Sequence, residues 1–316
     1  MCADEAAGIG VDVRALLPDG VRDNVLRVFG DRGRDWVEAL PGVVADLVER
    51  WELRLAAPRA YGGGTHSLVL PVIRAGGVPA VLKVPVRDDE NRDEAAALRC
   101  YAGDGAVLLY EADAESGALL LERLERLARC AALIDHPDRE MAIDVACALL
   151  RRLRRPPPAG HPFPLVRDLV LRWSEAIPTL WANGDQPLTA PLERETMAAL
   201  DALGEPDGAE VLVNRDAHLG NIIGAQREPW LLIDPKPLVG EPAFDGGWLL
   251  IDLLRAPTPG AAGRLAHRVG AGLGVEPDRV RMWALLRVIE NVLWDIQLGA
   301  DPAESLELAA ALAGAT

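Results

Sequence analysis

Residues 214–234 limit what this chain can fold into more than any other stretch. Three side chains that can bind a proton or a cation, Asp216, Asn221 and Asp234, alternate there with short apolar runs. Runs of two or three apolar residues bounded by Gly and Pro are typical of brief strands or of buried loop anchors. We therefore expect residues 211–213, 222–223 and 231–233 to hold the three polar side chains at the mouth of a core.

The spacing from Asp216 to Asn221 is that of a kinase catalytic loop. In such a loop the aspartate takes the proton of the acceptor hydroxyl and the asparagine binds a metal ion. Asp234 fits the second metal ligand. Asp and Asn are also common in ordinary turns, so the hypothesis depends on whether the rest of the chain supplies the other parts of a kinase.

Composition narrows the possible partners. The 316 residues include 48 acidic and 33 basic side chains, for a net charge of −15. Such a charge argues against nucleic acid or an anionic membrane as a partner and suits a cationic small molecule, although an acidic, solvated surface is the alternative. Half the residues are apolar, so the chain is globular and long enough for two lobes.

The cysteines and the start of the chain favour a cytoplasmic location. The four cysteines form no C-x-x-C pair and are interpreted as free thiols of a reducing compartment. The first residues lack the basic and apolar regions of a signal peptide. Because no apolar run approaches 18 residues, no membrane span is expected.

Hydrophobic periodicity divides the chain into three parts. Residues 1–50 are expected to be a helical segment, with helices broken at Gly30 and at 41–42. Residues 51–123 predict a five-stranded antiparallel sheet, with one helix (93–101) inserted after the third strand. The strands are expected at 51–56, 67–74, 78–84, 106–111 and 118–122. Residues 124–316 are expected to be mainly helical, with helices at 135–155, 165–182, 189–203 and 276–298.

The first lobe carries candidates for binding a nucleotide. A glycine-rich turn precedes the second strand, and Gly63, Gly64, Thr65 and Ser67 could cap phosphates with N–H and hydroxyl groups. Most such turns bind nothing, and this one is not a Walker A loop.

Lys83, on the third strand, could extend from an edge strand to solvent or hold the α- and β-phosphates. Glu94 is the expected ion-pair partner of Lys83, with Glu90 as the alternative. Glu122 and Leu124 lie where a hinge would bind adenine.

These parts occur in kinase order, and one block is specific enough to indicate a family. Residues 227–245, REPWLLIDPKPLVGEPAFD, resemble the aminoglycoside phosphotransferases, in particular the streptomycin 6-phosphotransferase/hydroxyurea phosphotransferase group. Supporting segments lie at 51–53, 103–107, 119–124 and 291–296, and the resemblance covers approximately residues 45–300.

This resemblance implies an α+β, protein-kinase-like fold of two lobes. It also implies transfer of the γ-phosphoryl group from ATP, with Mg²⁺, to a hydroxyl of a small cationic antibiotic. The 6-hydroxyl of streptomycin is the expected acceptor. The alternative acceptors are hydroxyurea and another small metabolite. The alternative to an active kinase is a nucleotide-binding pseudokinase without turnover. We expect a monomer.

The loop departs from the family pattern at its start. Where the family usually has His-Gly-Asp-Leu-His, with a bulky residue at the second place in some members, this chain has Asn214-Arg215-Asp216-Ala217-His218. Asn214 must therefore replace the hydrogen bonds of a histidine, and Arg215 adds a charge beside the base. His218 and Asp245 are expected to support the loop. Lys236 could contact substrate or pair with Glu241, and the ion pair is favoured.

The acceptor is expected to bind to the helix at 276–298. Its predicted core stripe consists of Leu285, Ile289, Val292, Leu293 and Ile296. Glu290, Asn291, Trp294 and Asp295 lie on other faces. A Trp beside carboxylates is a good receptor for a guanidinium group. The alternative is a solvated face without a ligand.

Overall fold

The structure is a computed structural model that describes residues 13–62, 65–124, 132–183, 188–254 and 260–314. The chain forms two compact units. The first comprises Met1–Gly103 and Val107–Glu125, and the second comprises Asp104–Ala106 and Arg126–Thr316. Within the described residues, no helix combines the length and the apolar character needed to cross a membrane.

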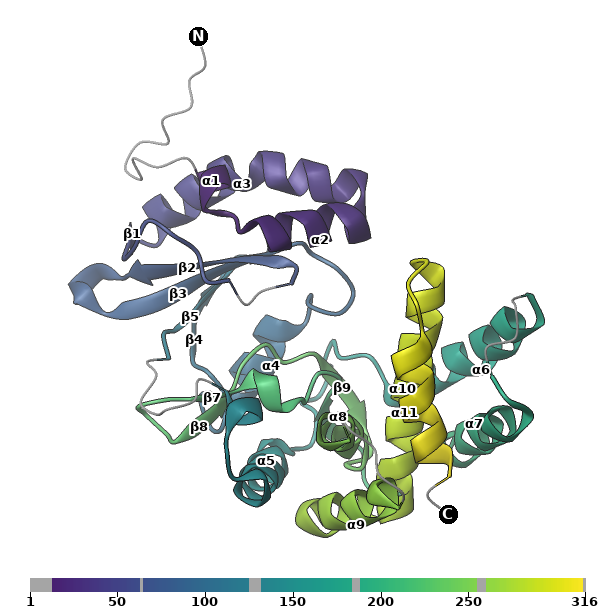
Figure 1. Ribbon diagram of the computed structural model, residues 1–316. Coiled ribbons are helices and arrows are strands. Elements are labelled where there is room, and N and C mark those ends of the chain that lie inside the picture. Colours follow the sequence, from purple (N-terminus) through teal and green to yellow (C-terminus); the bar gives the residue numbers. More distant parts are fainter. Residues whose placement is uncertain (1–12, 63–64, 125–131, 184–187, 255–259, 315–316) are drawn as a thin grey trace. The chain divides into compact units, whose positions relative to one another are not determined.

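The first unit is built on a five-stranded antiparallel sheet with the order β1-β2-β3-β5-β4 (Figure 1). The strands are β1 (Arg54–Leu55), β2 (Ser67–Ile73), β3 (Pro79–Pro85), β4 (Leu109–Ala112) and β5 (Leu119–Glu122). The helices are α1 (Val13–Leu16), α2 (Asp19–Phe29), α3 (Asp31–Arg50) and α4 (Glu94–Tyr101), and the last follows β3. The predicted sheet, with its helix after the third strand, is confirmed.

Alternation along β2 and β3 decides which face of the sheet is covered. Leu68, Leu70 and Val72 are fully buried, as are Leu82 and, nearly so, Val84. They share one core with α2 and α3, which lie across this face of the sheet (Figure 1). Because successive side chains of a strand point to opposite faces, Lys83 points to the other face.

Two expectations for the first helices and strands were wrong. Pro41 does not break α3, because the apolar face formed by Leu40, Val44 and Leu47 continues past it into the core. The first strand is limited to Arg54–Leu55, because Trp51 still closes α3, with its N–H donating to the carbonyl of Leu47.

The second unit is mainly helical and contains two small two-stranded sheets. Its α-helices are α5 (Arg139–Leu153), α6 (Val166–Asn183), α7 (Ala190–Leu203), α8 (Phe244–Leu253), α9 (Ala261–Leu273), α10 (Pro277–Gln297) and α11 (Ala303–Ala313). This unit also contains two short 3₁₀ turns, η2 (Leu133–Asp135) and η3 (Leu219–Asn221). A similar turn in the first unit, η1 (Ala75–Gly77), joins β2 to β3. The strands are β6 (Val211–Asn214), β7 (Ile222–Gly224), β8 (Trp230–Leu232) and β9 (Pro237–Gly240), paired as β6 with β9 and β7 with β8.

Helix α10 is the centre of this unit and contacts α7, α8, α9 and α11. Of its predicted core stripe, Leu285, Ile289, Val292 and Leu293 are buried, but Ile296 is 40% exposed, because the last turn of α10 extends beyond the core. Helix α5 begins later than expected, at Arg139, because Asp138 caps it by accepting a hydrogen bond from the N–H of Met141.

Candidate active site

The two small sheets place the polar side chains of residues 214–234. Antiparallel pairing of β7 with β8 aligns Ile222 with Leu232. One step beyond this pair, the N–H of Ile233 donates to the carbonyl of Asn221 over 2.9 Å. Asp234 follows directly, in the left-handed region with φ of 51°. This hydrogen bond therefore brings the backbones of the two expected metal ligands side by side.

Asp216 lies next to Asn221 in the same loop. The Nδ2 amide of Asn221 donates to the Asp216 carbonyl (3.1 Å) and carboxylate Oδ2 (3.3 Å). Lys236 Nζ lies 3.3 Å from the same Oδ2 atom. The expected pairing of Lys236 with Glu241 is therefore wrong: Glu241 is buried and pairs with Arg279 instead.

Asn214 closes the start of the loop. Its Oδ1 accepts from the N–H groups of Asp216 (3.0 Å) and Lys236 (2.9 Å), so one side-chain oxygen joins both strands that lead to the site. Its own N–H donates to Asp245 Oδ1 over 2.8 Å. No residue of the described chain accepts a hydrogen bond from the buried Nδ2 of Asn214.

Two carboxylates of α8, those of Asp245 and Asp252, accept hydrogen bonds from backbone N–H groups of the loop. Asp245 is buried, and this burial raises its pKa to about 7, although the N–H of Asn214 and the charge of Arg154 oppose the shift. Asp252 accepts a 2.6 Å hydrogen bond from the N–H of Leu219. Asp252 was not predicted from the sequence. Its spacing of seven residues from Asp245 places both on one face of a helix, which is the signal that could have found it.

His218 shapes the turn between Asp216 and Asn221. Its Nδ1 accepts a hydrogen bond from the N–H of Gly220 over 3.0 Å, and its Nε2 lies 3.8 Å from Asp216 Oδ1. A side chain at Gly220 would meet the imidazole ring at 2.7 Å. The histidine thus holds the loop backbone.

Glu290 of α10 reaches the loop through charged groups. Its carboxylate accepts hydrogen bonds from Trp173 Nε1 (3.0 Å), Arg215 Nη2 (2.7 Å) and Arg287 Nη1 (2.8 Å).

The other three expected acceptor contacts lie further along the helix. Asn291 is half-buried, Trp294 is 50% exposed, and Asp295 Oδ2 accepts from the hydroxyl of Ser305 over 3.1 Å.

In the first unit, Lys83 and Glu94 form a buried ion pair. Lys83 Nζ lies 2.6 Å from Glu94 Oε2, on the face of the sheet away from α2 and α3. Glu94 rather than Glu90 is thus the partner of the strand lysine.

The other expected nucleotide contacts are on connections. The carbonyl of Thr65 accepts from Asn24 Nδ2, and Ser67 opens β2. Glu122 ends β5, and its Oε2 accepts from the N–H of Leu108 over 3.1 Å. Leu124 is half-buried. Gly63 and Gly64 lie outside the described residues.

Asn221 and Asp234 suit a hard cation. The residues that the structure describes contain no group of three or more His, Cys, Asp or Glu side chains that could hold a metal ion. Mg²⁺, however, usually takes one or two protein oxygen ligands and completes its shell with water and phosphate oxygens. An amide and a carboxylate on residues whose backbones lie side by side fit that requirement.

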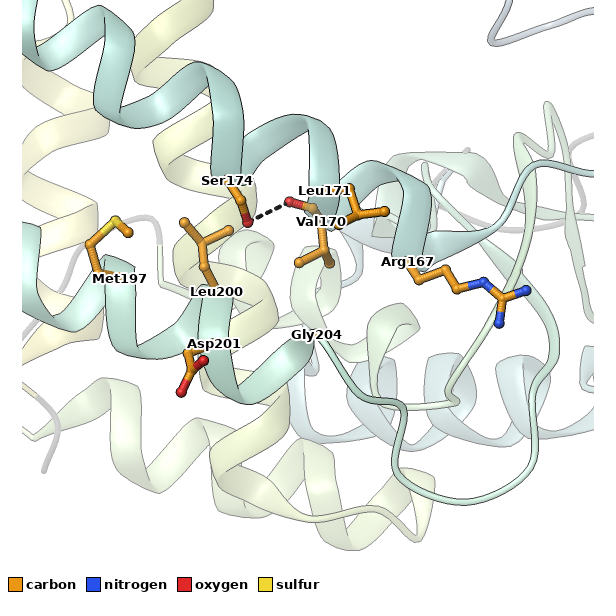
Figure 2. Close-up of a pocket in the computed structure, with 8 residues that line it drawn as sticks. All are labelled: Arg167, Val170, Leu171, Ser174, Met197, Leu200, Asp201 and Gly204. Atoms are coloured by element: carbon orange, nitrogen blue, oxygen red, sulfur yellow. Dashed lines mark hydrogen bonds between the residues drawn. The ribbon is translucent and has the colours of Figure 1, made fainter.

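A separate groove lies between α6 and α7, with a volume of about 350 Å³ (Figure 2). Val170 and Leu200 form its apolar floor, with Arg167 and Asp201 on α6 and α7 at its edges. None of the residues expected in the active site lines it. The groove therefore contributes nothing to the catalytic geometry.

Comparison with known proteins identifies the family. Residues 50–299 match the family model described as aminoglycoside/hydroxyurea antibiotic resistance kinase. The chain is 39% identical to a hydroxyurea phosphotransferase of Kitasatospora aureofaciens, over 87% of this chain and 78% of the relative. It is 36% identical to a streptomycin 6-kinase of Streptomyces griseus, over 90% and 92%.

Solved structures support the fold. Aminoglycoside phosphotransferase APH(4)-Ia, in a ternary complex with AMP-PNP and hygromycin B, superposes with a TM-score of 0.61 at 16% identity, covering 85% of this chain and 96% of the other. A choline/ethanolamine kinase family protein from Mesorhizobium loti gives 0.59 at 18% identity, covering 82% and 87%.

The fold and the loop define a small-molecule kinase of the protein-kinase-like class. The chain belongs to the aminoglycoside/hydroxyurea antibiotic resistance kinase family. The resemblance stated from the sequence, the α+β two-lobed fold class and the assignment as a phosphotransferase are thereby confirmed.

Proposed function

We propose that this protein transfers the γ-phosphoryl group of ATP to the 6-hydroxyl of streptomycin and so inactivates the antibiotic. The hydrogen bond from the N–H of Ile233 to the carbonyl of Asn221 carries the proposal, because it brings the backbones of the two proposed metal ligands, Asn221 and Asp234, side by side next to Asp216. Phosphoryl transfer depends on positioning and charge neutralisation, and this loop supplies both. The streptomycin 6-kinase of Streptomyces griseus supports the choice of acceptor.

Each side chain has a proposed role. Asp216 orients the acceptor hydroxyl and takes its proton, while Asn221 and Asp234 hold Mg²⁺ on the phosphates of the nucleotide. Lys83, held by Glu94, contacts the α- and β-phosphates. Thr65, Ser67 and the glycine turn at 63–64 are proposed to contact the phosphates, and the chain at Glu122 and Leu124 to contact adenine.

Acceptor recognition is proposed for the C-terminal half of α10. Trp294 exposes half of its surface, so an aromatic face is available for stacking against a guanidinium group. Asn291 and Asp295 lie about one turn apart on α10 and supply polar oxygens. The net charge of −15 favours a cationic acceptor. We further propose a monomer that works in the cytoplasm, where ATP is available, and gel filtration tests the monomer.

The test is turnover with Mg-ATP and streptomycin, followed by mass spectrometry of the product. Asp216→Asn keeps the shape of the side chain and removes the base, so we expect kcat to fall by about 10²- to 10⁴-fold. Asp201→Asn, an exposed change on α7, is the matched control and should leave kcat unchanged. Absence of phosphorylated streptomycin with the native chain would overturn the proposal.

Hydroxyurea is the second candidate acceptor, because the relative from Kitasatospora aureofaciens is a hydroxyurea phosphotransferase. A panel of streptomycin, hydroxyurea and other guanidino or hydroxyl compounds separates the two. Turnover of hydroxyurea without turnover of streptomycin would select the second candidate. Nucleotide binding without turnover of any acceptor would indicate a pseudokinase.

A further inference from the structure

We propose that Glu290 is a positioning residue, which holds Arg215 and through it the catalytic loop, and that it does not bind the acceptor. This inference rests on the proposed function for the identity of the reaction. The position that precedes Asp216 holds Arg215, where the family resemblance leads one to expect a glycine. Its long charged side chain forms an ion pair with Glu290, with Arg215 Nη2 2.7 Å from Glu290 Oε1.

The carboxylate of Glu290 is occupied on both oxygens. Oε1 accepts from Trp173 Nε1 at 3.0 Å and from Arg215 Nη2 at 2.7 Å, and Oε2 accepts from Arg287 Nη1 at 2.8 Å. The donors come from α6, from the catalytic loop and from α10 itself. Bonds between guanidinium and carboxylate groups are among the strongest hydrogen bonds in proteins. Glu290 thus ties three separate segments of this unit together.

Arg215 is held by its backbone as well as by its side chain. Its N–H donates to the carbonyl of Lys236 over 2.8 Å. Its carbonyl accepts from Arg287 Nη2 over 3.2 Å. Arg287 is itself buried and stacks over the ring of Trp248 at 5.1 Å. Because Arg287 bonds to both Glu290 and Arg215, fixing the carboxylate fixes the residue directly before Asp216.

The local charge also disfavours Glu290 as an acceptor contact. Arg215 and Arg287 place two positive charges on one carboxylate. A guanidinium of the acceptor would have to displace one of them and then lie beside it. A cation is better received at Asp295, whose Oδ2 accepts a hydrogen bond from the neutral hydroxyl of Ser305. The acceptor site therefore begins at Asn291 and excludes Glu290.

The test is a double-mutant cycle of Glu290→Gln and Arg215→Met, with kcat and KM measured for both substrates. Each single change should lower kcat by about 10- to 100-fold, because small misplacement of reacting groups is costly, while the KM of streptomycin stays within about twofold. The double variant should be no slower than the slower single variant, because both act through one contact. Arg215→Lys keeps the charge and should recover part of kcat.

Asp295→Asn is the matched control on the same helix. It should raise the KM of streptomycin and leave kcat nearly constant. If Glu290→Gln instead raises the KM of streptomycin at constant kcat, or if the two effects add, Glu290 is an acceptor contact and the proposal is overturned.

A second measurement is independent of the acceptor. Hydrogen–deuterium exchange of the peptide that covers residues 214–221 should be faster in Glu290→Gln and in Arg215→Met than in the native chain. Unchanged exchange in both variants would refute the positioning role even if streptomycin proves not to be the substrate. Conversely, faster exchange without streptomycin turnover would contradict only the proposed function.

Discussion

Asn214 and Asp245 together hold the start of the catalytic loop. The side-chain oxygen of Asn214 accepts two backbone hydrogen bonds, and Asp245 accepts the N–H of Asn214. A buried N–H group without an acceptor costs about 1–3 kcal/mol of folding free energy. Each of these three hydrogen bonds therefore helps to stabilise the folded loop. The departure at position 214 therefore leaves the loop supported through a different set of atoms.

The buried carboxyl of Asp245 makes stability depend on pH. Its pKa of about 7 in the folded chain exceeds the ordinary value of 3.8, and Arg154 is the cation that faces it. The folded state therefore retains a proton that the unfolded state loses. The stabilisation from this group is complete below pH 3.8 and is lost as the pH rises through 7.

We predict that Asp245→Asn flattens this dependence. The free energy of unfolding of the native chain, minus that of the variant, should fall between pH 5 and pH 8, by at most about 1.4 kcal/mol per pH unit. Urea unfolding of both proteins at four pH values measures this difference in the free energy of unfolding. Other groups titrate alike in both proteins and cancel in the difference. Parallel pH profiles for the two proteins would show that Asp245 does not hold the proton.

At the scale of elements, Gly247 allows α8 to pack closely against α10. A side chain at Gly247 would lie 3.1 Å from the backbone carbon of Trp283 and 3.2 Å from the nitrogen of Ala284. Backbone atoms of a central helix cannot move aside. The close approach keeps Asp245 and Asp252, both on α8, beneath the catalytic loop.

We predict that Gly247→Ala destabilises the protein by about 1–3 kcal/mol through this overpacking. Gly42→Ala is the matched control, because nothing lies within 4 Å of its would-be side chain in α3. That change should stabilise by about 0.5–1 kcal/mol, the usual gain for alanine in a helix. Thermal and urea unfolding of both variants provide the comparison. Equal stability of Gly247→Ala and the native chain would mean that α8 can shift.

Local patterns predicted the elements whose backbone hydrogen bonds are local, within one helix or across one hairpin. The strands β2 and β3 follow from alternation, and α10 follows from its apolar stripe. Strand β9 was not predicted, because it begins with Pro237 and pairs with β6, more than twenty residues away. The expected strand at 106–111 begins later, at Leu109, because Ala106 bridges to Leu232 in the second unit. Both differences depend on pairing between segments that are far apart in the sequence, and a short sequence window does not contain that information.

The same dependence on distant segments explains which contacts of the candidate site could not be predicted from the sequence. The candidate residues Asp216, Asn221 and Asp234 could be selected from the sequence by their type and spacing. The contacts of Lys236, Asp252 and Glu290 could not, because each depends on which distant segment lies opposite. Lys236 follows a left-handed residue at Asp234, which turns the chain back toward Asp216. Spacing along the chain does not record that turn.

At the scale of the whole molecule, charge should affect how the acceptor arrives. A net charge of −15 attracts a cation from a distance. The attraction weakens with salt, because the Debye length falls from about 30 Å at 0.01 M to about 8 Å at 0.15 M ionic strength. Local contacts in the site are screened much less. Ionic strength therefore separates the long-range contribution to acceptor capture from the contacts made once it is bound.

We predict that kcat/KM for streptomycin falls by about tenfold over this range of salt, whereas kcat changes little. Hydroxyurea carries no charge, so where the acceptor panel shows its turnover as well, its kcat/KM should be nearly constant and serves as the control within the same protein. The measurement is initial rates at saturating Mg-ATP with each acceptor across the salt series. Equal salt slopes for the two acceptors would mean that the acidic surface has no part in capture and is only a solvated exterior. A steeper slope for streptomycin would show that the overall charge contributes to selecting cationic acceptors, in addition to the residues of α10.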